Sequence, residues 1–128
     1  MEIRFKLSDG DGTKINADIA LFFDNTDRIF FNNQATDTWY IRAFTGGANT
    51  TSSAGVSVDD TYHVFRIECF PTGEVHFYID GVETSNSPIT TNIPDDAGDY
   101  LEFYHWVQTR EAVAHYIDID YCIARQEI

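Results

Sequence analysis

Aromatic rings stand beside charged groups at alternate positions in several segments of this chain. Tyr40 and Arg42 form one such pair, and Tyr104 and Trp106 place two rings at the same spacing. Alternate residues of a strand point to one side of a sheet. The CH faces of sugars pack on Trp and Tyr rings, and sugar hydroxyls hydrogen-bond with Asp, Glu and Arg. The pattern therefore predicts a glycan-binding face, comprising Tyr40, Arg42, Arg66, Glu68, His76, Tyr78, Tyr104, Trp106, Asp118 and Asp120.

The same side chains have two other interpretations. An antiparallel sheet that packs one face on a core leaves its other face polar, so they could simply face solvent. They could also pack on another subunit of an assembly. We take the assembly surface as the first expectation and the glycan-binding face as its alternative.

The elements that would position these residues are strands. Apolar and polar residues alternate with a period of two along most of the chain, and the composition is rich in Phe and Tyr. We predict strands at 2–7, 19–23, 28–32, 38–44, 101–107 and 116–125, with a long hairpin at 62–82. We predict loops at 46–55, capped by a short strand near Val56 and Val58, and at 85–98. Short strands separated by turns are typical of an all-β antiparallel sandwich, here one domain over 1–128.

Strand parity also predicts the core. The residues expected to face inward are Ile3, Phe5, Leu21, Ile29, Trp39, Ile41, Phe65, Ile67, Phe77, Ile79, Ile117 and Ile119. Cys69 falls on the side of Phe65 and Ile67, whereas Cys122 falls on the side of Asp118 and Asp120. Side chains on different faces rarely meet in disulfide geometry, so we expect two free, buried or half-buried thiols, with a disulfide as the alternative.

The charge balance is strongly acidic. The net charge is −13, with 21 Asp and Glu against 8 Lys and Arg. Nucleic acid and anionic membranes attract basic surfaces, so both rank low as partners. No apolar stretch is long enough to span a membrane, and the start, MEIRFKLSDGDGT, does not resemble a signal peptide. An acidic, Lys-poor surface is also typical of salt-adapted (halophilic) proteins; the alternative is an ordinary acidic protein.

The hairpin has a familiar pattern. Residues 62–68, then Pro71-Thr72-Gly73, then 75–82 resemble a stretch of concanavalin-A-like lectin and glucanase jelly rolls, which include laminin-G-like domains. Residues 91–94 and 117–121 resemble the last third of the same superfamily. The resemblance implies a jelly roll, either compact or lacking N-terminal strands, because such domains usually have strands ahead of the one equivalent to 2–7. An uncovered N-terminal edge strand would invite pairing, so we expect self-association or docking into a larger assembly.

The resemblance also raises two kinds of chemistry. Glucanases of this fold carry alternate carboxylates on one strand, and the nearest match here is Asp118 and Asp120, which Glu68 would have to complete; glycoside hydrolysis is therefore a remote alternative. Several members bind calcium, a cation that prefers oxygen ligands. The first place to look is Asp95, Asp96 and Asp99, although acidic turns are also ordinary turns. No other cofactor is predicted.

These observations predict a non-enzymatic structural or adhesion module with a lectin-like fold. The first expectation is a viral protein of the decoration, tail or fibre type, or a component of a surface assembly, located on a virion or an extracellular surface. Its partners would be copies of itself or other structural proteins. The alternative is a carbohydrate-binding module that recognises glycans through its aromatic and charged face.

Overall fold

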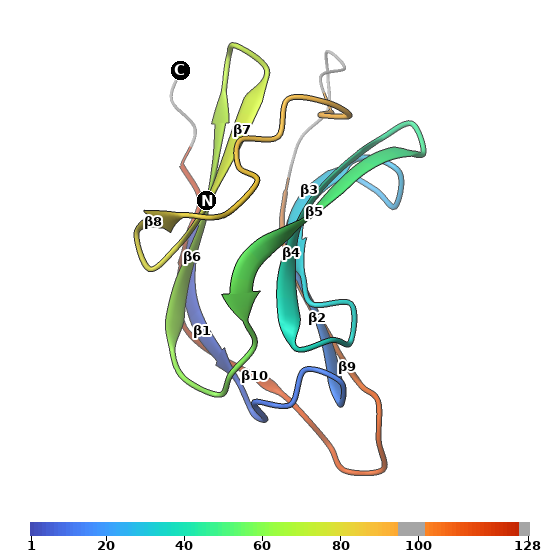
Figure 1. Ribbon diagram of the computed structural model, residues 1–128, viewed down its shortest axis with the longest axis vertical. Helices are drawn as coiled ribbons and strands as arrows, with labels where there is room; N and C mark the ends of the chain where they lie inside the picture. The colour runs from blue at the N-terminus through green and yellow to red at the C-terminus, as the bar shows by residue number, and fades with distance from the viewer. Residues whose placement is uncertain (95–101, 126–128) are drawn as a thin grey trace.

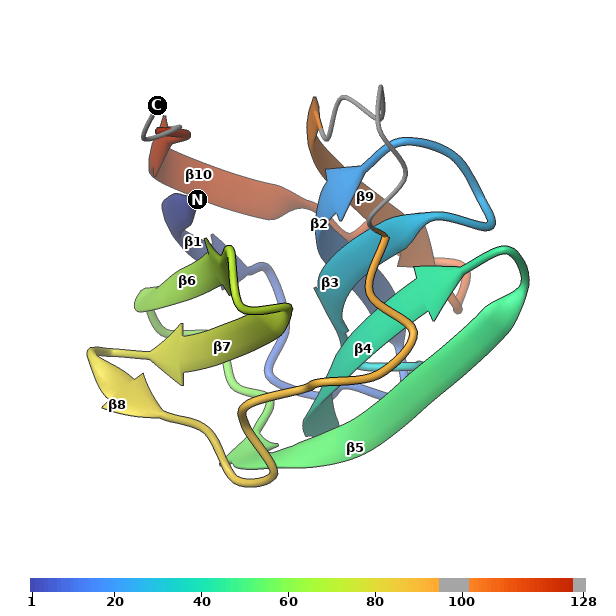
Figure 2. The ribbon, with the colours of Figure 1, turned by 90° about the horizontal axis from the view of Figure 1, so that it is seen from above.

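The chain folds into two packed antiparallel sheets. The computed structural model describes residues 1–94 and 102–125, which form ten strands and no helix. Sheet A has the order β10 (Ile117–Ile123), β1 (Glu2–Leu7), β6 (His63–Phe70), β7 (Glu74–Ile79) and β8 (Val82–Glu83). Sheet B has the order β5 (Ala48–Ser57), β4 (Thr38–Thr45), β3 (Arg28–Asn32), β2 (Ile15–Phe22) and β9 (Glu102–Thr109). Figures 1 and 2 show the sheets facing each other, which confirms the predicted β-sandwich.

In this part of the chain there is no helical segment of the length and apolarity that crossing a bilayer requires. The jelly-roll type of the sandwich stays a prediction.

Aromatic rings fill the space between the sheets. Phe65 of sheet A packs on Phe5 of its own sheet with ring centroids 4.7 Å apart. The same ring meets Phe31 and Trp39 of sheet B at 4.9 and 4.8 Å, both edge-on. Every residue predicted to face inward belongs to this core or packs against it. Interlocked rings from both sheets thus fix how the sheets stack.

The predicted hairpin is confirmed as β6 and β7. The amide of Gly73 donates to the carbonyl of Phe70 at 3.0 Å and closes the turn between them. The next turn, into β8, has both central residues in the left-handed region, with φ of 53° at Asp80 and 79° at Gly81. An Asp-Gly pair tolerates this conformation, which matches the twist of the flanking strands.

The prediction of a loop at 46–55 is wrong for residues 48–55, which belong to the ten-residue strand β5 (Ala48–Ser57), and holds only for the turn at Gly46 and Gly47. Among the residues that the structure describes, β5 is an edge strand that pairs with β4 alone. Only Ala54 of its residues is buried, and its Ser, Thr and Asn side chains are half-buried or exposed, so the apolar alternation expected of a strand is missing.

The prediction of an uncovered N-terminal edge is also wrong. β1 lies inside sheet A, where Ile3 is opposite Phe65 of β6 on one side and Cys122 of β10 on the other. The last strand of the chain therefore covers the first.

A β-bulge in β10 overturns the predicted placement of Cys122. Arg4 pairs with Tyr121 and Phe5 with Ile119, so Asp120 is an extra residue on β10. The extra residue reverses the parity beyond it, and Cys122 points to the same side as Ile119. Both cysteines are free and exposed rather than buried, and β1 separates their strands.

A buried asparagine ties the end of β3 to β2 and to the connection ahead of β2. Asn33, which is fully buried after β3, accepts a hydrogen bond from the Ala17 amide at 2.8 Å and donates to the carbonyls of Ile15 at 2.8 Å and Gly12 at 3.0 Å. A Cβ at Gly12 would lie 2.0 Å from the Thr36 carbonyl oxygen, so only glycine fits there. This junction holds the start of β2 against the end of β3.

Candidate functional site

The residues predicted to form one binding face lie on two opposite faces of the sandwich. Tyr40 and Arg42 of β4, with Tyr104 and Trp106 of β9, belong to sheet B. Strands of sheet A carry the others, which are Arg66, Glu68, His76, Tyr78, Asp118 and Asp120. Strand parity separates inward from outward side chains, but it cannot say which of two sheets an outward side chain belongs to. The residues of the one predicted binding face are therefore divided between the outer faces of the two sheets.

On the outer face of sheet A, these side chains contact one another. Arg66 stacks over the ring of Tyr78 at 4.2 Å, and its Nε lies 3.2 Å from a carboxylate oxygen of Glu68. His76 Nδ1 lies 2.6 Å from the Glu83 carboxylate.

The remaining two predicted residues of sheet A also have partners. Asp118 accepts a hydrogen bond from the Tyr62 hydroxyl at 2.8 Å, and Asp120 is paired with Arg4. The outer face of sheet A is thus a surface of mutual ion pairs and hydrogen bonds.

The same geometry keeps the acidic residues considered for glycoside hydrolysis apart. Asp118 is opposite Lys6 and bonded to Tyr62, so it is level with the start of β6, whereas Glu68 is near the end of β6. Six residues of strand between Tyr62 and Glu68 correspond to about 20 Å. Carboxyls that act on one glycosidic bond lie within about 10 Å of each other. Glu68 therefore does not complete a carboxylate set with Asp118.

The outer face of sheet B is built differently. Trp106, Asp18, Asn32 and Tyr40 are paired neighbours on β9, β2, β3 and β4 and form one row across the sheet. The row has an aromatic ring at each end and an acid and an amide between them. Three strand spacings separate the two rings, a distance of about 14 Å between backbones.

Two further rows lie beside the first. The next row runs Tyr104, Ala20, Phe30 and Arg42, and the third runs Phe22, Arg28 and Phe44. We call these three rows together the platform.

Stacked side chains cover the middle of the platform. Phe30 is 1% exposed although it points away from the core, because the guanidinium of Arg28 lies 4.4 Å and that of Arg42 5.1 Å from its ring centroid. Phe44 meets Phe30 edge-on at 5.2 Å, and Phe22 stacks on Tyr104 at 4.7 Å. The platform is thus a packed second layer of aromatic and guanidinium groups.

Asp18 and Asn32 are buried at the centre of the first row, with 8% and 4% of their surface exposed. Asn32 Nδ2 donates to the Asp18 carboxylate and to Asn16 Oδ1, the latter at 3.0 Å. Burial raises the pKa of Asp18, against the opposing effects of the Asn32 hydrogen bond and of Arg28, whose Nη1 lies 3.6 Å from the carboxylate. A buried carboxylate is costly to maintain and is more frequent at functional sites than on plain surfaces.

Two polar atoms of the platform are buried without a hydrogen-bond partner among the residues that the structure describes. They are Asn32 Oδ1 and Arg28 Nε. Buried polar groups are nearly always hydrogen-bonded, and an unsatisfied one costs about 1–3 kcal/mol. A bound molecule that supplied a donor and an acceptor here would remove that cost.

Arg42 has no carboxylate within 4.0 Å of its guanidinium within residues 1–94 and 102–125. Its Nε donates to Thr51 Oγ1 at 3.0 Å, which fixes the direction of the side chain. Burial, followed by the charge of Arg28, lowers the pKa of Arg42, whereas Asp18 opposes the change. Two neighbouring guanidinium groups on a strongly acidic protein favour a ligand that carries negative charge or many acceptor oxygens.

Sequence reasoning found only the outer members of the platform. It missed Asp18 and Asn32, although Asp18 is the one charged residue within the apolar run 17–23. A lone acid in such a run was the available signal. The proposed calcium ligands Asp95, Asp96 and Asp99 lie outside the described residues.

No protein-family model, curated protein or solved structure matches this chain. The likeness to concanavalin-A-like domains therefore stays a prediction that rests on the hairpin pattern.

Proposed function

We propose that this domain is a non-enzymatic carbohydrate-binding module that binds a short glycan across the platform. The observation that supports the proposal is the first row, in which Trp106 and Tyr40 flank the buried pair Asp18 and Asn32. Rings at the two ends of a row across four strands offer stacking surfaces for two separate sugars of one oligosaccharide. Between the rings, the Asp18 carboxylate and Asn32 Oδ1 offer acceptors for the hydroxyl groups of a sugar.

Arg42 indicates which class of glycan the platform would bind. Its half-buried guanidinium lies beside the first row and stacks over Phe30 and Phe44. A guanidinium binds a carboxylate or a sulfate more strongly than a neutral hydroxyl. Acidic glycans, such as those with uronic acid or sulfated units, should therefore bind more tightly than neutral ones.

The test is a glycan array that includes acidic and neutral oligosaccharides, followed by titration calorimetry with the best ligand. Trp106→Ala should reduce affinity about tenfold or more, because each stacked ring contributes on the order of 1–2 kcal/mol. Tyr78→Ala is the matched control, since Tyr78 is also an outward aromatic ring, but it lies on sheet A, where Arg66 stacks over it. An array without binders, or equal losses in the two variants, would contradict the proposal.

Assembly remains a second proposal, on different grounds. Within the described ranges 1–94 and 102–125, β10 is an edge strand of sheet A that pairs only with β1, and it exposes Ile123, which is 39% accessible. Unpaired edges promote association between chains. Multi-angle light scattering at high protein concentration tests this reading, and a monomeric mass would count against it. A virion or extracellular location stays a prediction tied to this proposal.

A further inference from the structure

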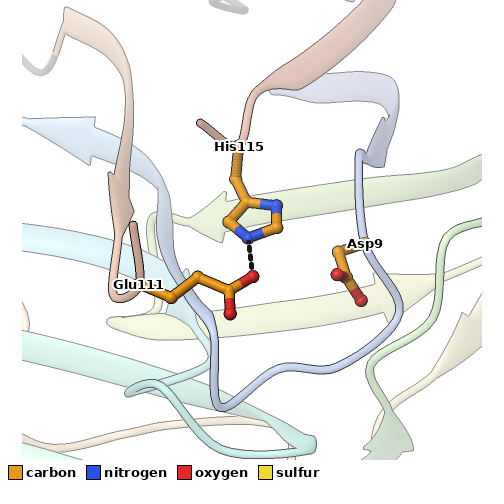
Figure 3. Close-up of side chains that lie close together, drawn as sticks. All are labelled: Asp9, Glu111 and His115. Atoms are coloured by element: carbon orange, nitrogen blue, oxygen red, sulfur yellow. Dashed lines mark hydrogen bonds and ion pairs between the residues drawn. The ribbon is translucent and has the colours of Figure 1, made fainter. Parts of the chain in front are cut away.

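Three side chains converge at the end of the sandwich where two connections pass between the sheets. Asp9 comes from the β1–β2 connection, and Glu111 and His115 come from the β9–β10 connection. One ligand atom from each lies within 4.8 Å of those of the other two. Figure 3 shows the imidazole and the two carboxylates around one space, and Figure 1 places both connections at the lower end of the molecule.

Hydrogen bonds between the two connections hold this arrangement. The Ser8 amide donates to the Tyr116 carbonyl at 3.0 Å, and the Tyr116 amide donates to Ser8 Oγ at 2.9 Å. Further along, the Arg110 amide donates to the Lys14 carbonyl at 2.7 Å. The segments that carry Asp9, Glu111 and His115 are therefore fixed to each other on both sides of the cluster.

His115 is oriented as a ligand would be. Its side chain is 5% exposed, and its amide donates to Thr109 Oγ1 at 3.1 Å. Nε2 faces the cluster, 2.8 Å from the Glu111 carboxylate, while Nδ1 lies 3.3 Å from Ser8 Oγ. Metal-binding histidines usually donate their second ring N–H to an oxygen, which fixes the tautomer and the ring. Ser8 Oγ can accept that bond in addition to the one from Tyr116.

The carboxylates have free ligand atoms. Asp9 uses Oδ1 to accept the Asp11 amide at 2.9 Å, which leaves Oδ2 available as a ligand atom. Glu111 is exposed and can rotate its second oxygen toward the same space.

Lys14 is the cation that now neutralises part of this cluster. Its Nζ lies 3.6 Å from both Asp9 Oδ2 and Asp11 Oδ2. The charge of Asp9, followed by those of Glu111 and Asp11, raises the pKa of Lys14. The ammonium group is exposed on a flexible stem, so a more strongly attracted cation can displace it without moving the backbone.

We propose that Asp9, Glu111 and His115 form a binding site for a divalent transition-metal ion, with zinc the best fit. An imidazole with two carboxylates is a donor set that suits zinc, whereas calcium and magnesium prefer oxygen ligands alone. Three protein ligands leave a position for water on the exposed side. Because the ligands come from two connections between the sheets, the ion would cross-link them and stabilise the fold.

The test is a titration of the metal-free full chain with zinc chloride, followed by calorimetry and thermal unfolding. We expect saturable binding of one ion and a rise in Tm of about 5 °C or more once zinc exceeds its dissociation constant a hundredfold. His115→Gln and Glu111→Gln should each weaken binding about tenfold or more, since even groups behind the ligands contribute that much. Lys14→Met should tighten binding, because it removes the competing cation.

Matched controls separate this site from general attraction to an acidic protein. His105→Gln and Glu102→Gln remove an exposed imidazole and carboxylate of β9 and should leave zinc affinity unchanged. Magnesium and calcium at the same concentrations should not raise Tm comparably.

The proposal is overturned if zinc does not saturate, or if Glu111→Gln binds zinc as tightly as the unmodified chain. An equal response to calcium would overturn it as well. Because Glu111 is exposed, its variant tests the site even if His115→Gln does not fold. None of these outcomes depends on glycan binding by the platform.

Discussion

Asp18 on β2 lies directly opposite Asn32 on β3, and the Asn32 amide group donates to the Asp18 carboxylate on the outward side of the sheet. Both residues are buried, although their side chains face away from the core. A buried polar pair with a guanidinium group beside it, that of Arg28, is a costly arrangement for a surface that only faces water.

Replacing Asp18 should have different effects on the stability of the fold and on glycan binding. Burial raises the pKa of Asp18, so the folded chain holds that proton more tightly than the unfolded chain does. Stability is therefore lost as pH rises from the ordinary Asp pKa through the raised one, and the full cost of ionisation is present above the raised pKa. Asp18→Asn should keep an acceptor for Asn32, remove this cost at pH 7, and leave the free energy of unfolding unchanged or up to about 1 kcal/mol higher.

The same variant should bind glycans about tenfold or more weakly, because hydrogen bonds to a charged acceptor contribute about 1.5–3 kcal/mol. Urea unfolding and calorimetry on the same preparation test both parts. A variant that is less stable and binds as well as the unmodified chain would show that Asp18 is only a structural residue.

Asn33→Ala should destabilise the fold by about 2–4 kcal/mol, because it leaves the Ala17 amide and the Ile15 and Gly12 carbonyls without their partner. Asn25→Ala, in the exposed turn before β3, is the control and should change stability by less than about 0.5 kcal/mol. Urea denaturation measures both. Equal effects at the two positions would contradict a structural role for Asn33.

His63 should make stability depend on pH. Desolvation lowers its pKa, but hydrogen bonds to Asp80 and Asp59, at 2.5 and 3.0 Å, outweigh it and raise the pKa overall. The stabilisation is thus fully present below the unfolded pKa of about 6.5 and is lost as pH rises through the higher folded pKa. His63→Gln should therefore lower the free energy of unfolding by about 1 kcal/mol at pH 5.5 and by less at pH 8.5. A loss that is the same at both values would rule out this linkage.

Salt should stabilise the protein. The net charge of −13 implies strong self-repulsion, which salt screens over about 3 Å at 1 M against about 30 Å at 0.01 M. Tm should rise by several degrees between these salt concentrations. A flat or falling Tm would favour an ordinary acidic protein over a salt-adapted one.

The sandwich was predictable because its signals are local. Alternation in β1, β6 and β7 and the turns at Gly73 and Gly81 identify strands and their inward faces without knowledge of partners. β5 was not predicted as a strand, because a polar edge strand has no apolar face that alternation could reveal.

The candidate site was only half predictable, because it depends on which strands are neighbours. Asp18 and Asn32 come together through pairing of β2 with β3, and Trp106 joins them through β9, which is far along the chain. Strand parity predicts which residues point outward, but it does not predict the sheet to which each one belongs. Residues of sheet A were therefore included in the predicted binding face together with those of sheet B. The bulge at Asp120, which exchanges faces for Cys122, likewise depends on the register with β1.

The pairing of Glu2 with Ile123 has a mechanical consequence. β1 begins and β10 ends at the same end of sheet A, in adjacent antiparallel strands. Tension applied between these two points would open the ladder one hydrogen bond at a time, because each bond is perpendicular to the strands and carries the load in turn. If the domain adheres to a surface under flow, force transmitted through its ends would peel β10 from β1 before it disturbed the platform on the other sheet.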